Sequence, residues 1–219
     1  MNQPFTRDDL RRKGAEKISG GRWANADLLL YTHSDGVWVV KDFMPCSPFI
    51  RKTWGAWMAA RELRALVHLQ GIPGIPADPF ALDTYAFCYR FVPGTNLKYI
   101  RRTNPPGADF FLKLEQSVRQ MHQRGIVHLD IRYMRNIVVS DTGDLLLLDF
   151  QTCLFLGRIP RCMHQFLKNI DISGVYKCWK RVSGKTIDPE RLAFLKKMEK
   201  RRSLWFFKGY PLGTRASRR

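Results

Sequence analysis

Short apolar runs that alternate with polar residues fill the first part of the chain and predict strands. Gly and Pro are residues that end strands and form turns, and Pro93–Gly94 ends the last of these runs. A Ser34–Asp35–Gly36 turn between two of the runs suits a hairpin. The runs are Leu28–Tyr31, Val37–Phe43, Ala81–Asp83 and Ala86–Val92. We therefore predict a small antiparallel sheet ahead of residue 94.

Helical spacing of apolar residues marks two longer segments. The first is Trp54–Gln70, which ends before Gly71 and Pro73, and the second is Ala108–Arg124, which ends before Gly125. The remaining segments have weaker patterns. For them we predict an arm or helix at 1–13, a polar loop over Arg101–Gly107, a loop with a short helix over Leu154–Ile170 and a helix over Pro189–Phe207.

A second predicted hairpin carries polar side chains at one end. Its strands are Ile137–Val139 and Leu145–Leu148, and Asp130, Asn136 and Asp149 flank them. Because an isolated charge is costly to desolvate beside buried strands, these groups need partners. Their oxygens suit a hard cation such as Mg²⁺. The alternative is an ordinary hairpin flanked by solvated acids.

Two charges fall on faces that are otherwise apolar. Lys41 shares its face of a strand with Val37 and Val39, so a buried lysine there needs an anion. Glu62 lies in the apolar stripe of the first helix, where pairing with Lys41 would offset the cost of burial. The alternatives are a lysine that reaches water and a glutamate that pairs with Arg61 or another exposed base.

Together these residues resemble the protein-kinase-like superfamily. His128–Leu129–Asp130, then Asn136, then Asp149–Phe150–Gln151 are similar to its catalytic loop and metal-binding strand. The resemblance implies that Asp130 is catalytic, that Asn136 and Asp149 bind Mg²⁺, and that Lys41, held by Glu62, positions the phosphates of ATP. His128 is then expected to brace the loop. Asn136 follows Asp130 by six residues instead of the usual five, so one residue must bulge out, and Gln151 replaces the usual Gly.

Two further segments complete the nucleotide site that the resemblance implies. Ile18, Ser19, Gly21 and Asn25 match the shortened glycine loop of RIO-type kinases, and Gly20 and Gly21 would bring backbone amides close to a phosphate. A plain turn is the other interpretation of that glycine pair. Tyr89 and Phe91 would belong to the segment that meets the adenine, with Tyr89 as pocket wall or core.

The expected fold class is α+β, a bilobal kinase-like fold in a minimal form. We expect an arm at 1–15, a sheet-containing N-lobe at 16–93, a short helical C-lobe at 94–210 and a basic tail at 211–219. Only 70 residues follow Asp149, and no Ala–Pro–Glu motif occurs. The chain therefore looks like RIO-type kinases or the lipopolysaccharide-core (Kdo) kinases.

Composition adds limits on class and compartment. Of 219 residues, 45% are hydrophobic, which is sufficient for a packed core. The five cysteines lack CxxC spacing, which disfavours a zinc site and suits reduced thiols. No secretory leader or long apolar span is visible, so we expect a cytoplasmic protein.

Charge is the last feature that changes the interpretation. The net charge is +18, and residues 158–219 alone hold 17 basic and 4 acidic residues. Such a field attracts anions. In the last predicted helix, bases interleave with Trp205, Phe206, Phe207 and Tyr210, which suits either an anionic membrane face or docking on the C-lobe.

Three functional hypotheses follow. The first is an ATP-dependent kinase for a hydroxyl of a sugar or lipid-linked anionic acceptor, with peripheral membrane association. The second is a RIO-like serine/threonine protein kinase, whose basic region would contact RNA; nucleic acid is the less favoured partner. The third is a pseudokinase binding module, motivated by Gln151 and the shifted Asn136.

Overall fold

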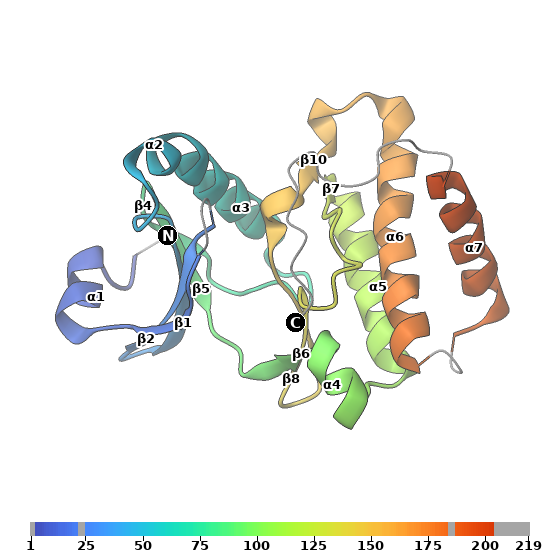
Figure 1. The fold of residues 1–219 in the computed structure, drawn as a ribbon, viewed down its shortest axis with the longest axis horizontal. Helices are drawn as coiled ribbons and strands as arrows, with labels where there is room; N and C mark the ends of the chain where they lie inside the picture. The colour runs from blue at the N-terminus through green and yellow to red at the C-terminus, as the bar shows by residue number, and fades with distance from the viewer. Residues whose placement is uncertain (1–2, 22–24, 184–186, 204–219) are drawn as a thin grey trace.

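The protein has an α+β fold, in which an antiparallel sheet and its helices lie beside a mainly helical region (Figure 1). The computed structural model describes residues 3–21, 25–183 and 187–203. The last predicted aromatic segment, with Trp205, Phe206, Phe207 and Tyr210, and the tail at 211–219 lie outside the described residues.

A five-stranded sheet dominates the N-terminal part, with the strand order β1-β2-β3-β5-β4. All its pairings are antiparallel, as the alternating sequence pattern predicted. The strands are β1 (Glu16–Ser19), β2 (Asp27–His33), β3 (Gly36–Asp42), β4 (Phe80–Asp83) and β5 (Ala86–Arg90).

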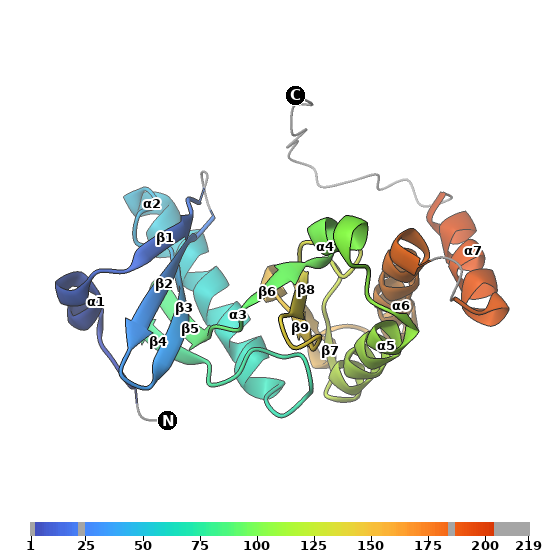
Figure 2. The ribbon, with the colours of Figure 1, turned by 90° about the horizontal axis from the view of Figure 1, so that it is seen from below.

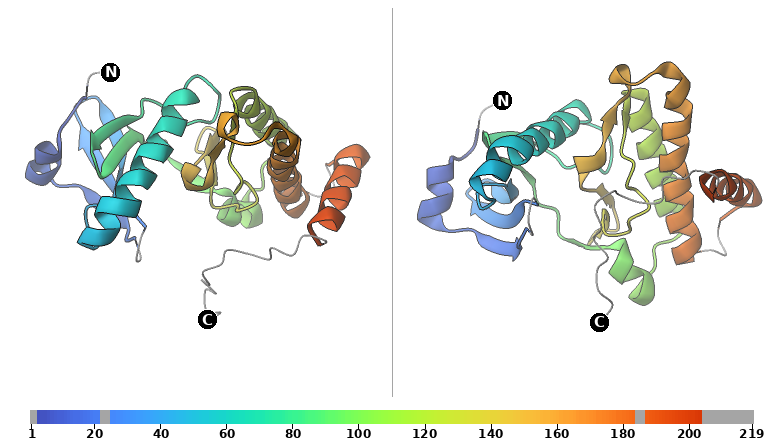
Figure 3. Two further views of the ribbon diagram at one scale, coloured as in Figure 1. Left: turned by 90° about the horizontal axis from the view of Figure 1, so that it is seen from above. Right: turned by 45° about the horizontal axis from the view of Figure 1, so that its top comes forward.

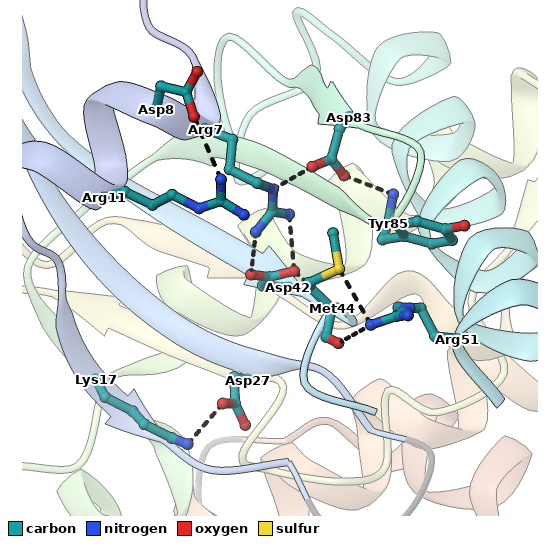
Figure 4. Close-up of polar contacts among 10 residues, drawn as sticks. All are labelled: Arg7, Asp8, Arg11, Lys17, Asp27, Asp42, Met44, Arg51, Asp83 and Tyr85. Atoms are coloured by element: carbon teal, nitrogen blue, oxygen red, sulfur yellow. Dashed lines mark hydrogen bonds and ion pairs between the residues drawn. The ribbon is translucent and has the colours of Figure 1, made fainter. Parts of the chain in front are cut away.

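The two faces of the sheet have separate cores. Trp38 and Val40 of β3 pack with Phe5, close to helix α1 (Arg7–Lys13). Figure 4 shows how α1 is attached: Arg7 donates to both carboxylate oxygens of Asp42, at 2.7 and 3.0 Å, and to Asp83.

The opposite face of the sheet packs on helix α3 (Ala56–His68), within the predicted range 54–70. The continuous helical segment begins earlier than the sequence predicted, because α2 (Pro48–Ile50) and a π-helical turn (Arg51–Gly55) lead directly into α3. Val39 and Phe87 of the sheet and Met58 and Leu66 of α3 belong to this core.

The chain leaves the sheet after β5 and enters a second, three-stranded sheet, ordered β6-β8-β9. Its strands are β6 (Gly94–Asn96), β8 (Ile137–Ser140) and β9 (Leu145–Leu147), so the second predicted hairpin is confirmed. Helix α4 (Leu97–Thr103) follows β6, so the loop predicted from Arg101 was wrong at its start. Beyond it, β7 (Ile126–Val127) pairs with β10 (Leu154–Phe155).

Three helices build the rest of the molecule and lie side by side in two views (Figures 1 and 2). They are α5 (Ala108–Gln123), α6 (Arg161–Ser183) and α7 (Pro189–Ser203). The expected loop and helix over 154–170 are confirmed, but the helix is much longer than expected: short 3₁₀ turns at Phe150–Thr152 and Leu156–Arg158 precede α6, which has 23 residues and continues to Ser183. None of the helices in the described part of the chain is long and apolar enough to cross a bilayer.

Candidate functional site

A buried ion pair joins the first sheet to α3. The Nζ atom of Lys41, on β3, donates to both oxygens of Glu62, at 2.8 and 2.7 Å. Lys41 reaches α3 because it lies on the face of the sheet that also carries Val39 and Phe87. The predicted pairing of these two side chains is confirmed.

Because this ion pair is buried, its surroundings determine the charge on Lys41. The side chain of Lys41 is 9% exposed and that of Glu62 is 2% exposed. Burial by itself lowers the pKa of Lys41, but the negative charges of Glu62 and Asp149 outweigh it and raise the pKa above the ordinary lysine value. The ammonium is therefore charged at any physiological pH.

Asp149 brings the second sheet to the same ammonium. Its Oδ1 lies 3.1 Å from Lys41 Nζ, and the next backbone N–H, of Phe150, donates to Glu62 at 3.1 Å. Asp149 has φ 66°, the left-handed region that non-glycine residues avoid. A backbone held in this strained conformation turns the carboxylate towards Lys41 while leaving its side chain 42% exposed.

Asp130 and Asn136 meet in the loop before β8. The Nδ2 atom of Asn136 donates to Oδ2 and to the backbone carbonyl of Asp130, at 3.1 and 3.2 Å. Two successive turns, in which Tyr133 N donates to Asp130 O and Asn136 N to Tyr133 O, take up the additional residue of this loop. Arg132 and Arg135 are exposed on these turns. The turns bring Asn136 back to Asp130 although the loop is one residue longer.

His128 and the backbone tie this loop to the segment that leads from β9 to Asp149. The carbonyl of Leu148 accepts from His128 Nε2 at 3.1 Å, which leaves Nδ1 to accept from Asp130 N at 3.3 Å. Leu148 N also donates to the carbonyl of Asn136 at 2.7 Å. Both ring nitrogens of His128 thus serve the loop's geometry, as the bracing role requires.

Burial also affects the carboxyl group of Asp130. Desolvation raises its pKa, and the hydrogen bond from Asn136 and the nearby charges of His128 and Arg132 oppose this only in part. A carboxylate with a raised pKa holds a proton more readily than an exposed aspartate. It is therefore better suited to take a proton from a hydroxyl.

Sequence reasoning missed Asp171, which supports the whole loop from α6. Its carboxylate, 1% exposed, accepts from the backbone N–H groups of His128 and Leu129, at 2.8 and 2.7 Å, and from His122 Nε2 at 2.9 Å. These bonds hold Leu129 in the left-handed region, at φ 68°. The available signal was an acid between Ile170 and Ile172, but the predicted short helix ended at Ile170.

The glycine pair lies at the turn between β1 and β2, part of which is outside the described residues. A Cβ at Gly21 would come within 2.0 Å of the Asn25 carbonyl, so the turn itself requires glycine there. Gly21 N donates to Asp27 at 2.6 Å, and Lys17 Nζ lies 2.6 Å from the same carboxylate. Gly20 and Asn25 are exposed, and the N–H of Gly21 is already engaged by Asp27.

Tyr89 lies on β5, the strand that pairs with the strand of Lys41, and Phe91 directly follows β5. Tyr89 is buried on β5, directly opposite Val39, and burial raises the pKa of its hydroxyl. Phe91 N donates to Val37 O at 3.0 Å, and its ring packs partly buried against the main core. Tyr89 is therefore a residue of the main hydrophobic core, which is one of the two predicted alternatives.

The donor set near Asp149 fits Mg²⁺ bound together with a polyphosphate. Asp149 offers a partly exposed carboxylate, and Asn136, which donates through Nδ2, keeps its Oδ1 as an acceptor. No group of three or more His, Cys, Asp or Glu that could hold a metal occurs among the residues that the structure describes. Mg²⁺ commonly uses one or two carboxylates and completes its shell with water and phosphate oxygens.

Comparison with known proteins adds no relative: neither a protein-family model nor a curated protein sequence matches this chain.

Proposed function

We propose that this chain is an ATP-dependent kinase that transfers the γ-phosphoryl group to a hydroxyl of a sugar or lipid-linked acceptor. One observation carries the proposal: a buried ammonium is shared by two carboxylates from distant parts of the chain. Lys41 lies 2.7 Å from Glu62 and 3.1 Å from Asp149. In protein kinases this lysine, paired with a helix glutamate, holds phosphates, and the aspartate beside it holds Mg²⁺.

The proposed fold is bilobal. The first sheet with α3 would be the N-terminal lobe, and the second sheet with α4–α7 the C-terminal lobe. The order of elements supports this, because α3 lies between β3 and β4, and the chain leaves the first sheet at residues 91–93 for β6. ATP would bind between the lobes, against Lys41 and Tyr89.

Each residue of the site has a separate task in the proposed transfer. Lys41 binds phosphate oxygens, and Glu62 fixes the direction of its ammonium. When bound by Asp149 and Asn136, Mg²⁺ supplies charge neutralisation at the phosphoryl oxygens. Asp130 orients the acceptor hydroxyl and takes its proton as the new O–P bond forms, so that positioning and electrostatics provide most of the acceleration.

The proposed acceptor is anionic. Arg132 and Arg135 are exposed on the loop that carries Asp130, and the chain has a net charge of +18. Such a field concentrates phosphorylated or carboxylated acceptors near the site. A RIO-like protein acceptor is the alternative within the same chemistry. Use of ATP places the proposed activity in the cytoplasm.

A second candidate is a nucleotide-binding module that does not transfer phosphate. The contact between Asn136 Nδ2 and Asp130 Oδ2, at 3.1 Å, favours it, because the amide occupies an oxygen that an acceptor hydroxyl would need. Gln151 in place of glycine after Asp149–Phe150 points the same way. The two candidates differ in turnover but agree on nucleotide binding.

Turnover and binding measured on one pair of variants test both candidates. Asp149→Ala removes the proposed metal ligand, whereas Asp141→Ala removes an exposed acid from the turn of the same hairpin. We expect Mg²⁺-dependent ADP release in the native chain and in Asp141→Ala, and none in Asp149→Ala. Unchanged turnover in Asp149→Ala would refute the kinase. Calorimetry showing Mg²⁺-dependent ATP binding without turnover in the native chain would support the binding module.

A further inference from the structure

The outer face of α2 and α3 exposes large aromatic side chains. Phe49 is 79% exposed, Trp54 is 50% exposed and Trp57 is 49% exposed, all within three helical turns of one another. Large apolar side chains so exposed and so close together mark an interaction surface rather than scattered surface residues. The inner face of the same helix carries Glu62.

Charge on this surface has one sign. Glu62 is the only acid between residues 48 and 68, and it is buried against Lys41. Lys52 and Arg64 are exposed, and Arg61 is half-buried. The outer face of α2–α3 therefore offers aromatic rings and positive charge without any exposed carboxylate.

The neighbouring segment after Asp149 extends the same surface. A groove of about 280 Å³ runs between α3 and residues 153–159, and its lining includes Arg61, Arg64 and Arg158. Residues 150–170 contain no acid, and Met163, near the start of α6, is 40% exposed. Both segments lie along the upper side of the molecule in Figure 1 and face the viewer in Figure 3, left.

We propose that this basic aromatic face, made of Phe49, Lys52, Trp54, Trp57, Arg61, Arg64 and Arg158, docks on an anionic lipid bilayer. Aromatic rings with a polar edge settle at the level of lipid headgroups, and nearby Lys and Arg side chains attract anionic lipids. The groove between α3 and residues 153–159 is lined by three arginines, Arg61, Arg64 and Arg158, whose positive charge would attract a lipid phosphate. Charge complementarity thus selects a membrane of negative surface charge.

The ring geometry favours a bilayer over single-stranded RNA. Stacking of bases requires free aromatic faces. Here the rings of Trp54 and Trp57 already pack on each other, with centroids 5.2 Å apart, and Arg61 lies over the Trp57 ring at 4.8 Å. About half of each tryptophan and most of Phe49 remain exposed, which suits shallow insertion between headgroups rather than base stacking.

Docking would turn the segment after Asp149 towards the membrane. Arg61 donates to the backbone carbonyl of Cys153, so α3 and this segment are joined at the proposed surface. In this orientation the proposed site could receive a lipid-linked acceptor from the membrane. That consequence rests on the proposed kinase function, but the docking itself does not.

Vesicle pelleting with the full chain tests the docking. We expect binding to phosphatidylglycerol vesicles and weak binding to phosphatidylcholine vesicles. Trp54→Ala with Trp57→Ala, and separately Arg64→Glu, should each weaken binding roughly tenfold. The matched controls are Tyr99→Ala, which removes a ring that is 56% exposed on α4, and Lys113→Glu, which reverses an exposed charge on α5. Both controls should bind as the native chain does.

Brominated phosphatidylglycerol provides a second readout that does not depend on affinity. It should quench tryptophan fluorescence of the native chain, and much less that of Trp54→Phe with Trp57→Phe. Four outcomes would each overturn the proposal. They are equal loss of binding in the controls, unchanged binding in the face variants, unchanged quenching in Trp54→Phe with Trp57→Phe, and loss of RNA binding instead of vesicle binding. Asp149→Ala should bind vesicles normally, so failure of the kinase and failure of the docking are distinguishable. Circular dichroism confirms that each variant is folded.

Discussion

At the scale of single residues, Asp130 links the geometry of the site to pH. The proposed transfer needs its carboxylate ionised, and burial raises its pKa above the ordinary aspartate value. The rate should therefore fall as pH falls through this raised pKa, at a higher pH than an exposed aspartate would give. The measurement is kcat/KM against pH. Asp130→Asn should lower kcat by roughly 10²- to 10⁴-fold and remove this acidic limb. An acidic limb that survives in Asp130→Asn would assign it to another group.

Glu62 tests how much of the fold depends on the buried pair. Glu62→Gln leaves the Lys41 ammonium buried with Asp149 as its remaining carboxylate, so the free energy of unfolding should fall by about 3 kcal/mol. Glu199→Gln removes an exposed partner 3.9 Å from Lys177, and it should change that free energy by less than about 1 kcal/mol. Urea unfolding provides both values. Equal effects of the two substitutions would show that removing the buried partner of Lys41 destabilises the protein no more than removing an exposed partner of Lys177.

The Lys41 part of this pair's pH dependence follows from the raised pKa of Lys41, and burial raises the pKa of Glu62 as well. Its contribution to stability is fully present below the pKa that lysine has in the unfolded chain, and it is lost only as pH rises through the folded value. The difference in stability between Glu62→Gln and the native chain should not change through titration of Lys41 at neutral pH.

At the scale of elements, α6 packs directly on the loop that carries Asp130. A Cβ at Gly174 would lie 3.0 Å from Arg132 N and 3.3 Å from Ile131 Cβ, so Gly174→Ala pushes the loop that carries Asp130. We expect kcat to fall by roughly tenfold or more, because small displacements of reacting groups are costly. Gly157→Ala is the matched control, since no atom lies within 4 Å of its added Cβ. Steady-state kinetics of the folded variants measures kcat for each. An equal kcat in both variants would mean that the loop accommodates the methyl group.

The elements that the sequence predicted well have a marked apolar pattern. The helices α3 and α5 each have one apolar stripe, whereas β3 is a short apolar run that is buried on both faces. These patterns placed Lys41 and Glu62 among buried residues, where each needed a partner. The helix α6 lacks such a stripe because it is buried on several sides. Asp171, Gly174 and Trp179 are all buried on it. Its length and the support that it gives to His128 could not be predicted from periodicity.

The candidate site was predictable where a residue's environment is local in the sequence. Asp130 and Asn136 could be expected at the same end of the second hairpin, although the two turns that close the loop between them were not foreseeable. Asp171 is different: the backbone groups that it binds are more than forty residues earlier, and nothing in its own neighbourhood identifies them. Contacts of this kind follow only from the packed fold.

At the scale of the whole molecule, contacts along α3 join the first sheet to the helical region. Near the site, Lys41 meets Asp149. At the far end of α3, His68 and Arg124 bond to each other's carbonyls, both at 3.0 Å, and Leu147 N donates to Gly74 O at 2.7 Å. The helix α3 is therefore fixed to both regions, and a ligand between them should stabilise the molecule as one unit.

A thermal shift with Mg²⁺ and ATP tests this unity. A ligand at a hundred times its Kd adds about 2.7 kcal/mol of stability, which for a chain of this size raises Tm by roughly 5–10 °C. We expect that shift in the native chain with ATP and Mg²⁺ together, and a much smaller one with ATP alone. Asp149→Ala should lose the Mg²⁺-dependent part, and Asp141→Ala should keep it. Two separate transitions, of which only one responds to ATP, would show that the regions unfold independently and that the nucleotide contacts only one of them.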